Sequence, residues 1–215
     1  MVAQLYYTPT SCGAASFICA QKAGLLGTKV QANEANISTK KVVTGPNKDK
    51  DFCGINPKGN VPAIVTDDNA VLNENVATLA WIADQNPSAE LAPPKNTNQY
   101  YEFLSKLSYL ASEVHAVCGP LFNPQTPNEV KAFMKTKLMT KFDYISKNEF
   151  KRGKYLMGAK ISAADVYFYV ILSWMKYLNI DVSEYPVLKK FSEDVGSLDF
   201  VKAGHAAMAA ASPPQ

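Results

Sequence analysis

The stretch that decides the fold of this chain covers residues 56–81 and reads NPKGNVPAIVTDDNAVLNENVATLAW. It contains two short apolar runs, Ala63–Val65 and residues 70–72, separated by the turn formers Asp67-Asp68-Asn69. Asp and Asn favour tight turns because their side chains hydrogen-bond the nearby backbone and tolerate left-handed conformations. The pattern therefore predicts two antiparallel strands that fold back on each other.

A helix is predicted directly after this strand pair. Beyond Leu72 the apolar residues recur at the helical spacing i, i+3, i+4 and i+7, namely Val76, Leu79, Ala80 and Ala83. The Asn86-Pro87 pair should end the helix. Glu74 and Asn75 then lie in its first turn, where free N–H groups and the positive end of the helix dipole favour an anion such as a ligand carboxylate.

The Val61-Pro62 pair offers a second binding element in the same stretch. A residue before proline is held in an extended conformation, so the Val61 backbone can pair with an extended ligand as an added strand. Spacing alone does not make this bond cis, since only about one X-Pro bond in twenty is cis. One stretch therefore contains both a backbone edge and a helix start that favours an anion, which together could bind a small peptide.

The N-terminal residues predict a strand followed by a reactive thiol. Residues 4–7 read as a buried first strand, and the breaker Thr8-Pro9-Thr10 precedes Ser11-Cys12 and a helix that Gly24 stops. At a helix start the dipole should stabilise a thiolate and lower the pKa of Cys12 by about one unit. The residues alone leave open an equally plausible role for Cys12 as a small buried apolar side chain.

The second half of the chain predicts helices only. A linker rich in proline and polar residues covers residues 87–98, between a domain at 1–86 and an all-helical domain at 99–215. The predicted helices cover residues 99–118, 127–147, 162–178 and 186–195, with 206–215 as a loose tail. Ser162 at N-cap and Asp165 at N3 form a near capping box for the third of these helices.

Composition limits the class of protein. The 215 residues include 19% charged and 47% hydrophobic residues, which is typical of a globular chain. A net charge of +3 with scattered basic residues argues against nucleic-acid binding. The four cysteines have no paired spacing and the chain has only two histidines, so we expect neither a metal site nor disulfides. Free cysteines are typical of a reducing compartment. No signal peptide or bilayer-length apolar stretch is evident, so we expect a cytoplasmic protein without membrane contact.

Four stretches carry a resemblance to a known family: LYYTPTSC (residues 5–12), INPKGNVPAI (55–64), LNENVATLAWIAD (72–84) and SEVHAVCGPLF (112–122). The chain resembles the cytosolic glutathione transferases and looks closest to their bacterial beta class. The resemblance implies an α/β N-terminal thioredoxin-like domain of order βαβαββα plus an all-α C-terminal domain. It also implies a homodimer that uses glutathione as co-substrate, with no separate cofactor, to attack hydrophobic electrophiles in detoxification.

The resemblance also assigns roles in the glutathione site. Val61-Pro62 would be the cis proline loop that holds the cysteinyl part of glutathione, and Glu74 and Asn75 would hold its γ-glutamyl end. The family usually has Ser or Thr where this chain has Asn75. Lys41 matches the lysine aimed at the glycyl carboxylate, within an insertion-prone segment.

The resemblance places the remaining catalytic candidates as follows. His115 matches a beta-class histidine near the active-site thiol, and Ser108 stands where that class often has an Asn contributed across the dimer. Cys12 matches the beta-class cysteine, while Ser11 remains a candidate for the serine that other classes use. Without the resemblance, His115 would be a solvated or capped histidine and Glu74 an ordinary charge in a first helical turn.

Two functions stay open at this point. The first is an enzyme that conjugates glutathione to electrophiles and, through Cys12, catalyses thiol transfer or peroxide reduction. The alternative is a noncatalytic binding or regulatory module of the same fold.

Overall fold

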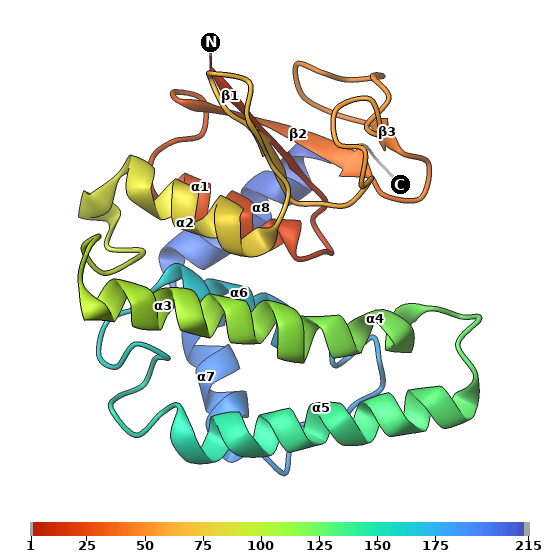
Figure 1. The fold of residues 1–215 in the computed structure, drawn as a ribbon, viewed down its shortest axis with the longest axis vertical. Coiled ribbons are helices and arrows are strands. Elements are labelled where there is room, and N and C mark those ends of the chain that lie inside the picture. The colour runs from red at the N-terminus through yellow and green to blue at the C-terminus, as the bar shows by residue number, and fades with distance from the viewer. Residues whose placement is uncertain (1, 213–215) are drawn as a thin grey trace. The chain divides into compact units, whose positions relative to one another are not determined.

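The computed structural model describes residues 2–212, which fall into two compact units. The first unit combines the residues up to Ala92 with those from Ser197 onward, and the second is Pro93–Gly196. Figure 1 shows the course of the chain through the elements of each unit. No helix of the described residues is both long and apolar enough to cross a bilayer.

A five-stranded mixed sheet forms the centre of the first unit. Its order is β3-β2-β1-β4-β5, and β1 runs parallel to β2 while the other neighbours are antiparallel. The strands are β1 (Ala3–Tyr7), β2 (Val30–Asn36), β3 (Lys41–Val42), β4 (Ala63–Val65) and β5 (Val71–Leu72). Helix α1 (Gly13–Lys22) contacts both α2 (Asn75–Gln85) and α8 (Asp199–Ala211) beside these strands (Figure 1).

The decisive stretch folds as its sequence predicts. Strands β4 and β5 pair antiparallel with Ile64 opposite Leu72, and Asn69 takes a positive φ of 68° in the turn between them. Helix α2 follows and ends before Asn86. A short 3-10 helix, Pro87–Ala89, comes next.

The predicted βαβαββα order is wrong in one element, because no helix lies between β2 and β4 in the described chain. The segment forms the two-residue strand β3 and a series of turns instead. Gly45 adopts a φ of 84°, and the Asn47 side chain donates to the Tyr6 hydroxyl at 2.7 Å. The backbone N–H of Asn47 also donates to the Asn33 side chain at 3.0 Å. These contacts with β1 and β2 hold the segment as a loop.

The predicted loose tail is also wrong for residues 206–211, which belong to α8. Alanine is the strongest helix former, and the buried face of α8 consists of Val201, Gly204 and Met208. A Cβ at Gly204 would lie 2.7 Å from Ile18 Cγ1, so the absence of a side chain lets α8 approach α1 closely. Because α8 packs on α1, its residues group with the first unit, unlike the expected domain at 99–215. Residues 213–215 lie outside the described residues.

Helices build the whole second unit. Its core is aromatic, with the ring of Phe168 in contact with the rings of both Phe142 and Phe191. The predicted capping box is confirmed, because Asp165 accepts from the backbone and side chain of Ser162 at 2.8 and 2.7 Å. The elements are α3 (Asn98–Tyr109), a π-helical segment (Leu110–His115), α4 (Ala116–Phe122), α5 (Asn128–Asn148), α6 (Ala163–Ser173) and α7 (Pro186–Gly196).

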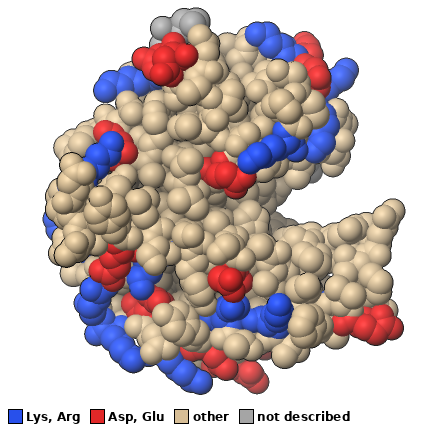
Figure 2. Space-filling model, in the orientation of Figure 1, with Lys and Arg blue, Asp and Glu red and all other residues tan. Residues whose placement is uncertain are grey.

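Charges on the surface are mixed in sign. On the face shown in Figure 2, basic and acidic side chains are interspersed and no broad basic area forms. Non-specific binding to nucleic acid requires a continuous basic surface, and this face does not offer one.

Candidate functional site

The central contact of the candidate site joins Cys12 to the loop before β4. Cys12 immediately precedes α1, and its Sγ donates to the Val61 carbonyl oxygen at 3.1 Å. The Val61-Pro62 peptide bond is cis. Residues 49 positions apart in sequence thus place a thiol on the backbone edge that the sequence singled out.

The electrostatics of Cys12 differ from the sequence-based expectation. Burial raises the pKa of the Cys12 thiol to about 12, although backbone hydrogen bonds at the helix start lower it. The charge of Glu74 raises it further. A thiolate at a helix N-terminus gains roughly 0.3–2 kcal/mol from the dipole, and here the cost of removing that charge from water is larger. In this structure Cys12 is therefore a neutral hydrogen-bond donor, not the acidic thiol that its position predicted.

Ser11 has a different task in the structure. Its hydroxyl donates to the Thr8 carbonyl oxygen at 2.9 Å and accepts from the Gly13 backbone N–H at 3.1 Å. Both bonds close the turn that leads into α1. The serine thus stabilises the start of the helix and the position of the neighbouring thiol.

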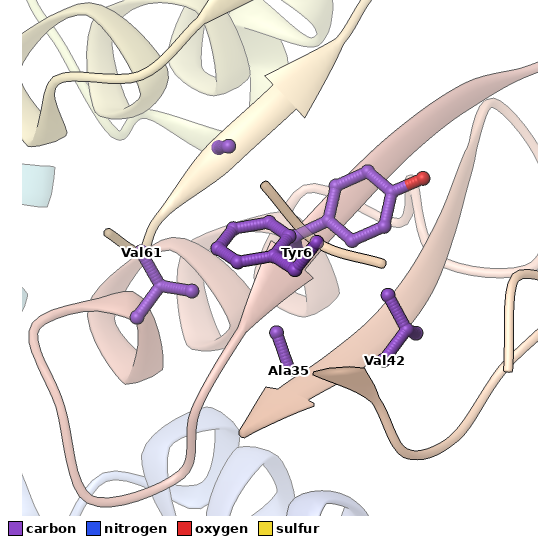
Figure 3. Close-up of a cluster of buried hydrophobic side chains, with 6 residues drawn as sticks. Tyr6, Ala35, Val42 and Val61 are labelled. Atoms are coloured by element: carbon purple, nitrogen blue, oxygen red, sulfur yellow. The ribbon is translucent and has the colours of Figure 1, made fainter. Parts of the chain in front are cut away.

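Val61 belongs to a buried apolar cluster. Tyr6, Ala35, Val42 and Val61 gather beside one another in Figure 3, and the full cluster also includes Phe52 and Ala63. The rings of Tyr6 and Phe52 are in tilted contact, with centroids 5.6 Å apart. This packing fixes the backbone edge that faces Cys12.

Asn56 anchors the same loop through polar contacts, and sequence reasoning gave it no role. Its side-chain amide donates to the Asn60 carbonyl oxygen at 2.7 Å and accepts from Asn73 at 2.9 Å. Asn56 is fully buried, so these bonds replace its contacts with water. The bonds tie the loop to the segment between β5 and α2. The residue could be noticed only as the first position of the Asn-Pro-Lys-Gly turn.

The start of α2 lies as predicted, but its two residues face different surroundings. Glu74 is the N-cap residue, and its exposed carboxylate pairs with Lys58 Nζ at 2.6 Å. Asn75 is buried, and its Oδ1 accepts from the Ser16 hydroxyl of α1 at 3.3 Å. Its side-chain Nδ2 has no hydrogen-bond partner within residues 2–212. The Asn75 side chain thus lies in the α1–α2 packing, which leaves the first-turn N–H groups as the candidate for holding an anion.

The two lysines at the start of β3 also differ. Lys41 is exposed and pairs with Asn36 in the β2–β3 register. Lys40 has a positive φ of 57°, and its Nζ donates to the Gly59 carbonyl oxygen at 2.7 Å. The cation that contacts the loop before Pro62 is therefore Lys40, the neighbour of the residue that the resemblance selected. The left-handed conformation of Lys40 changes the direction of its side chain, and no pattern in the sequence predicted this conformation.

His115 and Ser108 belong to the second unit. His115 ends the π-helical segment, and its Nδ1 lies 2.7 Å from the Tyr167 hydroxyl of α6. The Trp174 ring lies against the imidazole, with centroids 4.9 Å apart. Ser108 is exposed on α3, and its carbonyl oxygen accepts from the Ser112 hydroxyl at 3.0 Å.

The other cysteines are packing residues or lie outside these contacts. Cys19 and Cys118 are fully buried, and Cys118 donates to the Val114 carbonyl oxygen at 3.5 Å. Burial raises the pKa of the Cys118 thiol to about 12. Cys53 is partly exposed, and all four cysteines are free. In the described part of the chain, no group of three or more His, Cys, Asp or Glu side chains could hold a metal ion.

Comparison with known proteins agrees with this architecture. The family model for the glutathione S-transferase C-terminal domain matches residues 112–203. Glutathione S-transferase GstA of Escherichia coli O157:H7 is 33% identical over 171 residues, which cover 80% of this chain and 81% of that protein.

Solved structures extend the similarity over nearly the whole chain. A sphingomonad glutathione S-transferase complexed with glutathione superimposes with a TM-score of 0.87 at 33% identity, covering 96% of this chain and 98% of that one. A bacterial beta class glutathione S-transferase of Sphingomonas chungbukensis gives a TM-score of 0.86 at 34% identity, with 95% and 98% covered.

The mixed sheet with its helices and the separate helical unit together are the glutathione transferase fold, as the sequence predicted. The chain belongs to the glutathione S-transferase family. Its structural neighbours include bacterial members of the beta class.

Proposed function

We propose that this protein is a glutathione transferase that binds glutathione as co-substrate and transfers it to hydrophobic electrophiles. The observation that carries the proposal is the contact between the Cys12 thiol and the Val61 carbonyl oxygen. It brings a sulfur atom to a backbone edge that can pair with a peptide, so a bound cysteinyl peptide would present its own sulfur beside Cys12.

The proposed binding mode uses each end of the tripeptide. The cysteinyl backbone pairs with Val61, beside Pro62, as an added strand. The γ-glutamyl carboxylate lies at the first-turn N–H groups of α2, with Glu74 and Asn75 at that end. For the glycyl carboxylate the resemblance proposes Lys41, and the contact of Lys40 with Gly59 supports Lys40 as the competing candidate.

Conjugation makes use of Cys12 as a hydrogen-bond donor. Glutathione loses its thiol proton to water, and the resulting thiolate attacks an electrophilic carbon, forming a C–S bond while the leaving group departs with its electron pair. When Cys12 turns its S–H from Val61 to that thiolate, it stabilises the charge without ionising itself. The raised pKa of Cys12 suits this role, because a neutral thiol keeps its proton to donate.

Thiol transfer would proceed through a mixed disulfide. The Cys12 thiolate attacks the glutathione sulfur of a mixed disulfide, and the substrate leaves as a thiolate that takes up a proton. A second glutathione thiolate then attacks the Cys12–glutathione disulfide, which releases oxidised glutathione and restores the Cys12 thiolate. Since this route needs Cys12 ionised, we expect its rate to rise with pH below the raised pKa of the Cys12 thiol.

Further parts of the proposal concern assembly and location. We propose a homodimer, supported by large apolar side chains exposed on α3 and α5: Tyr101 is 60% exposed and Phe133 58%. In a dimer Ser108 would be offered across the interface, and a solution mass near 23.5 kDa, that of one chain, would contradict it. Four free cysteines support a reducing compartment, the cytoplasm. A role in detoxification is proposed from the family resemblance alone.

The test is turnover with glutathione, using a generic aryl halide electrophile and a small mixed disulfide in parallel. We expect Cys12→Ala to lose disulfide reduction by about 10²-fold or more, because the nucleophile is gone. Cys19→Ala is the matched control, since it removes a buried thiol from α1, the helix that Cys12 precedes. Full disulfide reduction by Cys12→Ala would overturn the role of Cys12.

Two further outcomes separate the alternatives. Loss of conjugation in Ser11→Ala with no loss in Cys12→Ala would make Ser11 the activating residue. Retention of the unaltered protein on immobilised glutathione without turnover would instead establish the noncatalytic binding module. His115→Ala, assayed in the same way, tests the proposed catalytic role of the histidine.

A further inference from the structure

Asn56 uses every hydrogen-bonding position of its side-chain amide. The residue is fully buried, and its Nδ2 donates to the Asn60 carbonyl oxygen at 2.7 Å and to the Asn60 side-chain oxygen at 3.0 Å. Its Oδ1 accepts from the Asn73 side chain at 2.9 Å and from the Lys58 backbone N–H at 3.3 Å. A backbone carbonyl can only accept and a backbone N–H can only donate, so these two partners settle which way the amide is turned.

The bond to the Asn60 carbonyl fixes the peptide group that Asn60 shares with Val61. This peptide bond is trans, so its C=O and N–H point to opposite sides. With the carbonyl held by Asn56, the Val61 N–H points away from Asn56, and it has no hydrogen-bond partner among residues 2–212. Val61 is only 6% exposed, and its side chain belongs to the apolar cluster of Figure 3. A buried N–H without a partner is rare, and it indicates an acceptor that a ligand would supply.

The bond from Asn73 links the same side chain to the start of α2. Asn73 directly precedes Glu74, the N-cap residue of that helix. Asn56 therefore joins the residue before Val61 to the residue before the α2 N-cap, and all of them belong to the first unit. The Lys58–Glu74 ion pair joins the same two segments, but both of its side chains are more than half exposed, which weakens such a pair. The buried amide is thus the firmer of the two links.

We propose that Asn56 is a positioning residue, which holds the Val61 N–H and the start of α2 in one fixed relation so that a peptide ligand can contact both at once. The role rests on the proposed function, in which the cysteinyl backbone of glutathione lies at Val61 and its γ-glutamyl carboxylate at α2. A second contact made by a ligand that is already bound is favoured by its high effective concentration, provided that the two contact points keep the distance that the ligand spans. Asn56 acts through this distance alone, without touching the ligand.

The proposal separates glutathione from cysteinylglycine, the dipeptide that lacks the γ-glutamyl group. Only glutathione makes the contact at α2, so only its affinity depends on the link between the two segments. Asn73→Ala removes that link and leaves the bond to Asn60 in place. We expect it to raise the Kd for glutathione about tenfold and to change the Kd for cysteinylglycine by less than about twofold. Asn56→Ala also frees the Asn60 carbonyl, so it should weaken the binding of both peptides, and that of glutathione more.

The experiment is a titration of the 215-residue chain with each peptide, followed by NMR so that weak affinities can also be measured. Asn33→Ala is the matched control, because Asn33 is an equally buried amide of the same unit that bonds Gln4 and the Asn47 backbone and takes no part in the link. We expect this control to leave both Kd values unchanged. The double variant of Asn56→Ala and Asn73→Ala should lose no more glutathione affinity than Asn56→Ala, since both substitutions remove the same bond.

Each result decides the proposal. An unchanged Kd for glutathione in Asn73→Ala would overturn it, and so would an equal weakening of both peptides in that variant, which would mean a general loosening of the site. If Asn56→Ala does not fold, Asn73→Ala still gives the answer, because the Asn73 side chain is only partly buried. Binding of neither peptide by the unaltered protein would refute the proposed function. Binding of glutathione with the same preference in all variants would refute the role of Asn56 alone.

Discussion

The thiol of the first unit and the imidazole of the second each make a hydrogen bond, but the partners differ in kind. Cys12 donates to a backbone carbonyl oxygen at 3.1 Å, and His115 meets a tyrosine hydroxyl at 2.7 Å. A backbone partner cannot be deleted by substitution, so the thiol contact is set by how the Val61 loop folds. A side-chain partner can be deleted, and one oxygen atom decides the imidazole contact. The comparison separates a group controlled by main-chain geometry from one controlled by side-chain chemistry.

The largest expected loss of stability in the second unit comes from removing Asp165, which holds the start of α6. Asp165 is fully buried and accepts three hydrogen bonds, from the Leu156 N–H and from the N–H and hydroxyl of Ser162. We expect Asp165→Ala to lower the free energy of unfolding by about 2–4 kcal/mol, since three donors lose their acceptor. Chemical denaturation at pH 7 measures this loss.

The pH dependence of that loss has a definite sign. Burial raises the pKa of Asp165 from 3.8 to about 6, so between these values the folded state binds more protons than the unfolded state. The contribution of Asp165 to stability is then largest below pH 4 and falls as pH rises through 6. The gap between the unaltered protein and Asp165→Ala should therefore narrow from pH 4 to pH 7. A gap that widens would contradict the raised pKa.

The pH dependence of Cys12 reactivity tests the raised pKa of its thiol in the first unit. With a pKa near 12, its thiolate fraction rises about tenfold per pH unit throughout the range below that value. We expect alkylation of Cys12 by iodoacetamide, followed by peptide mass spectrometry, to accelerate about 100-fold from pH 7 to pH 9. An alkylation rate that reaches a plateau below pH 8 would mean that Cys12 has the lowered pKa that its helix position predicted.

Substitutions of two glycines, one in a helix of each unit, test how closely those helices are packed. Gly204 of α8 meets Ile18 of α1, whereas a Cβ at Gly119 of α4 would have nothing within 4 Å. We expect Gly204→Ala to destabilise by about 1–3 kcal/mol through overpacking. Gly119→Ala should stabilise by about 0.5–1 kcal/mol, because alanine is the better helix former. Thermal unfolding of both variants measures the difference, and equal shifts would refute the close approach of α8 to α1.

The smallest effect should come from the ion pair beside the thiol region. Lys58 and Glu74 are paired at 2.6 Å, but their side chains are 51% and 64% exposed. Exposed pairs contribute about 0–1 kcal/mol. Lys58→Met should therefore change stability by less than about 0.5 kcal/mol in denaturant titration. A larger loss would mean that the pair fixes the start of α2.

The sequence predicted those parts of the molecule whose causes are local. The β4–β5 turn, the start of α2 and the Ser162–Asp165 capping box each depend on residues within a few positions of one another. The family resemblance carried the rest of the fold class. Local chemistry, together with one resemblance, was enough for the fold class.

The parts that could not be predicted depend on contacts between distant residues. The pKa of Cys12 is set by burial, which no helix position reveals. The alanines of α8 had no apolar period strong enough to predict a helix, because their packing depends on Gly204 fitting against Ile18. The contact of Lys40 with Gly59 depends on one left-handed residue, and the Tyr167–His115 bond joins positions 52 residues apart.

The placement of α8 has a consequence for biosynthesis. The helix that packs on α1 leaves the ribosome only after the whole of Pro93–Gly196. Until then the α1 surface around Ile18 lacks its cover, so the unit that starts first is the last to be completed. The intervening helical unit can fold during that delay, while the first unit waits for its last helix.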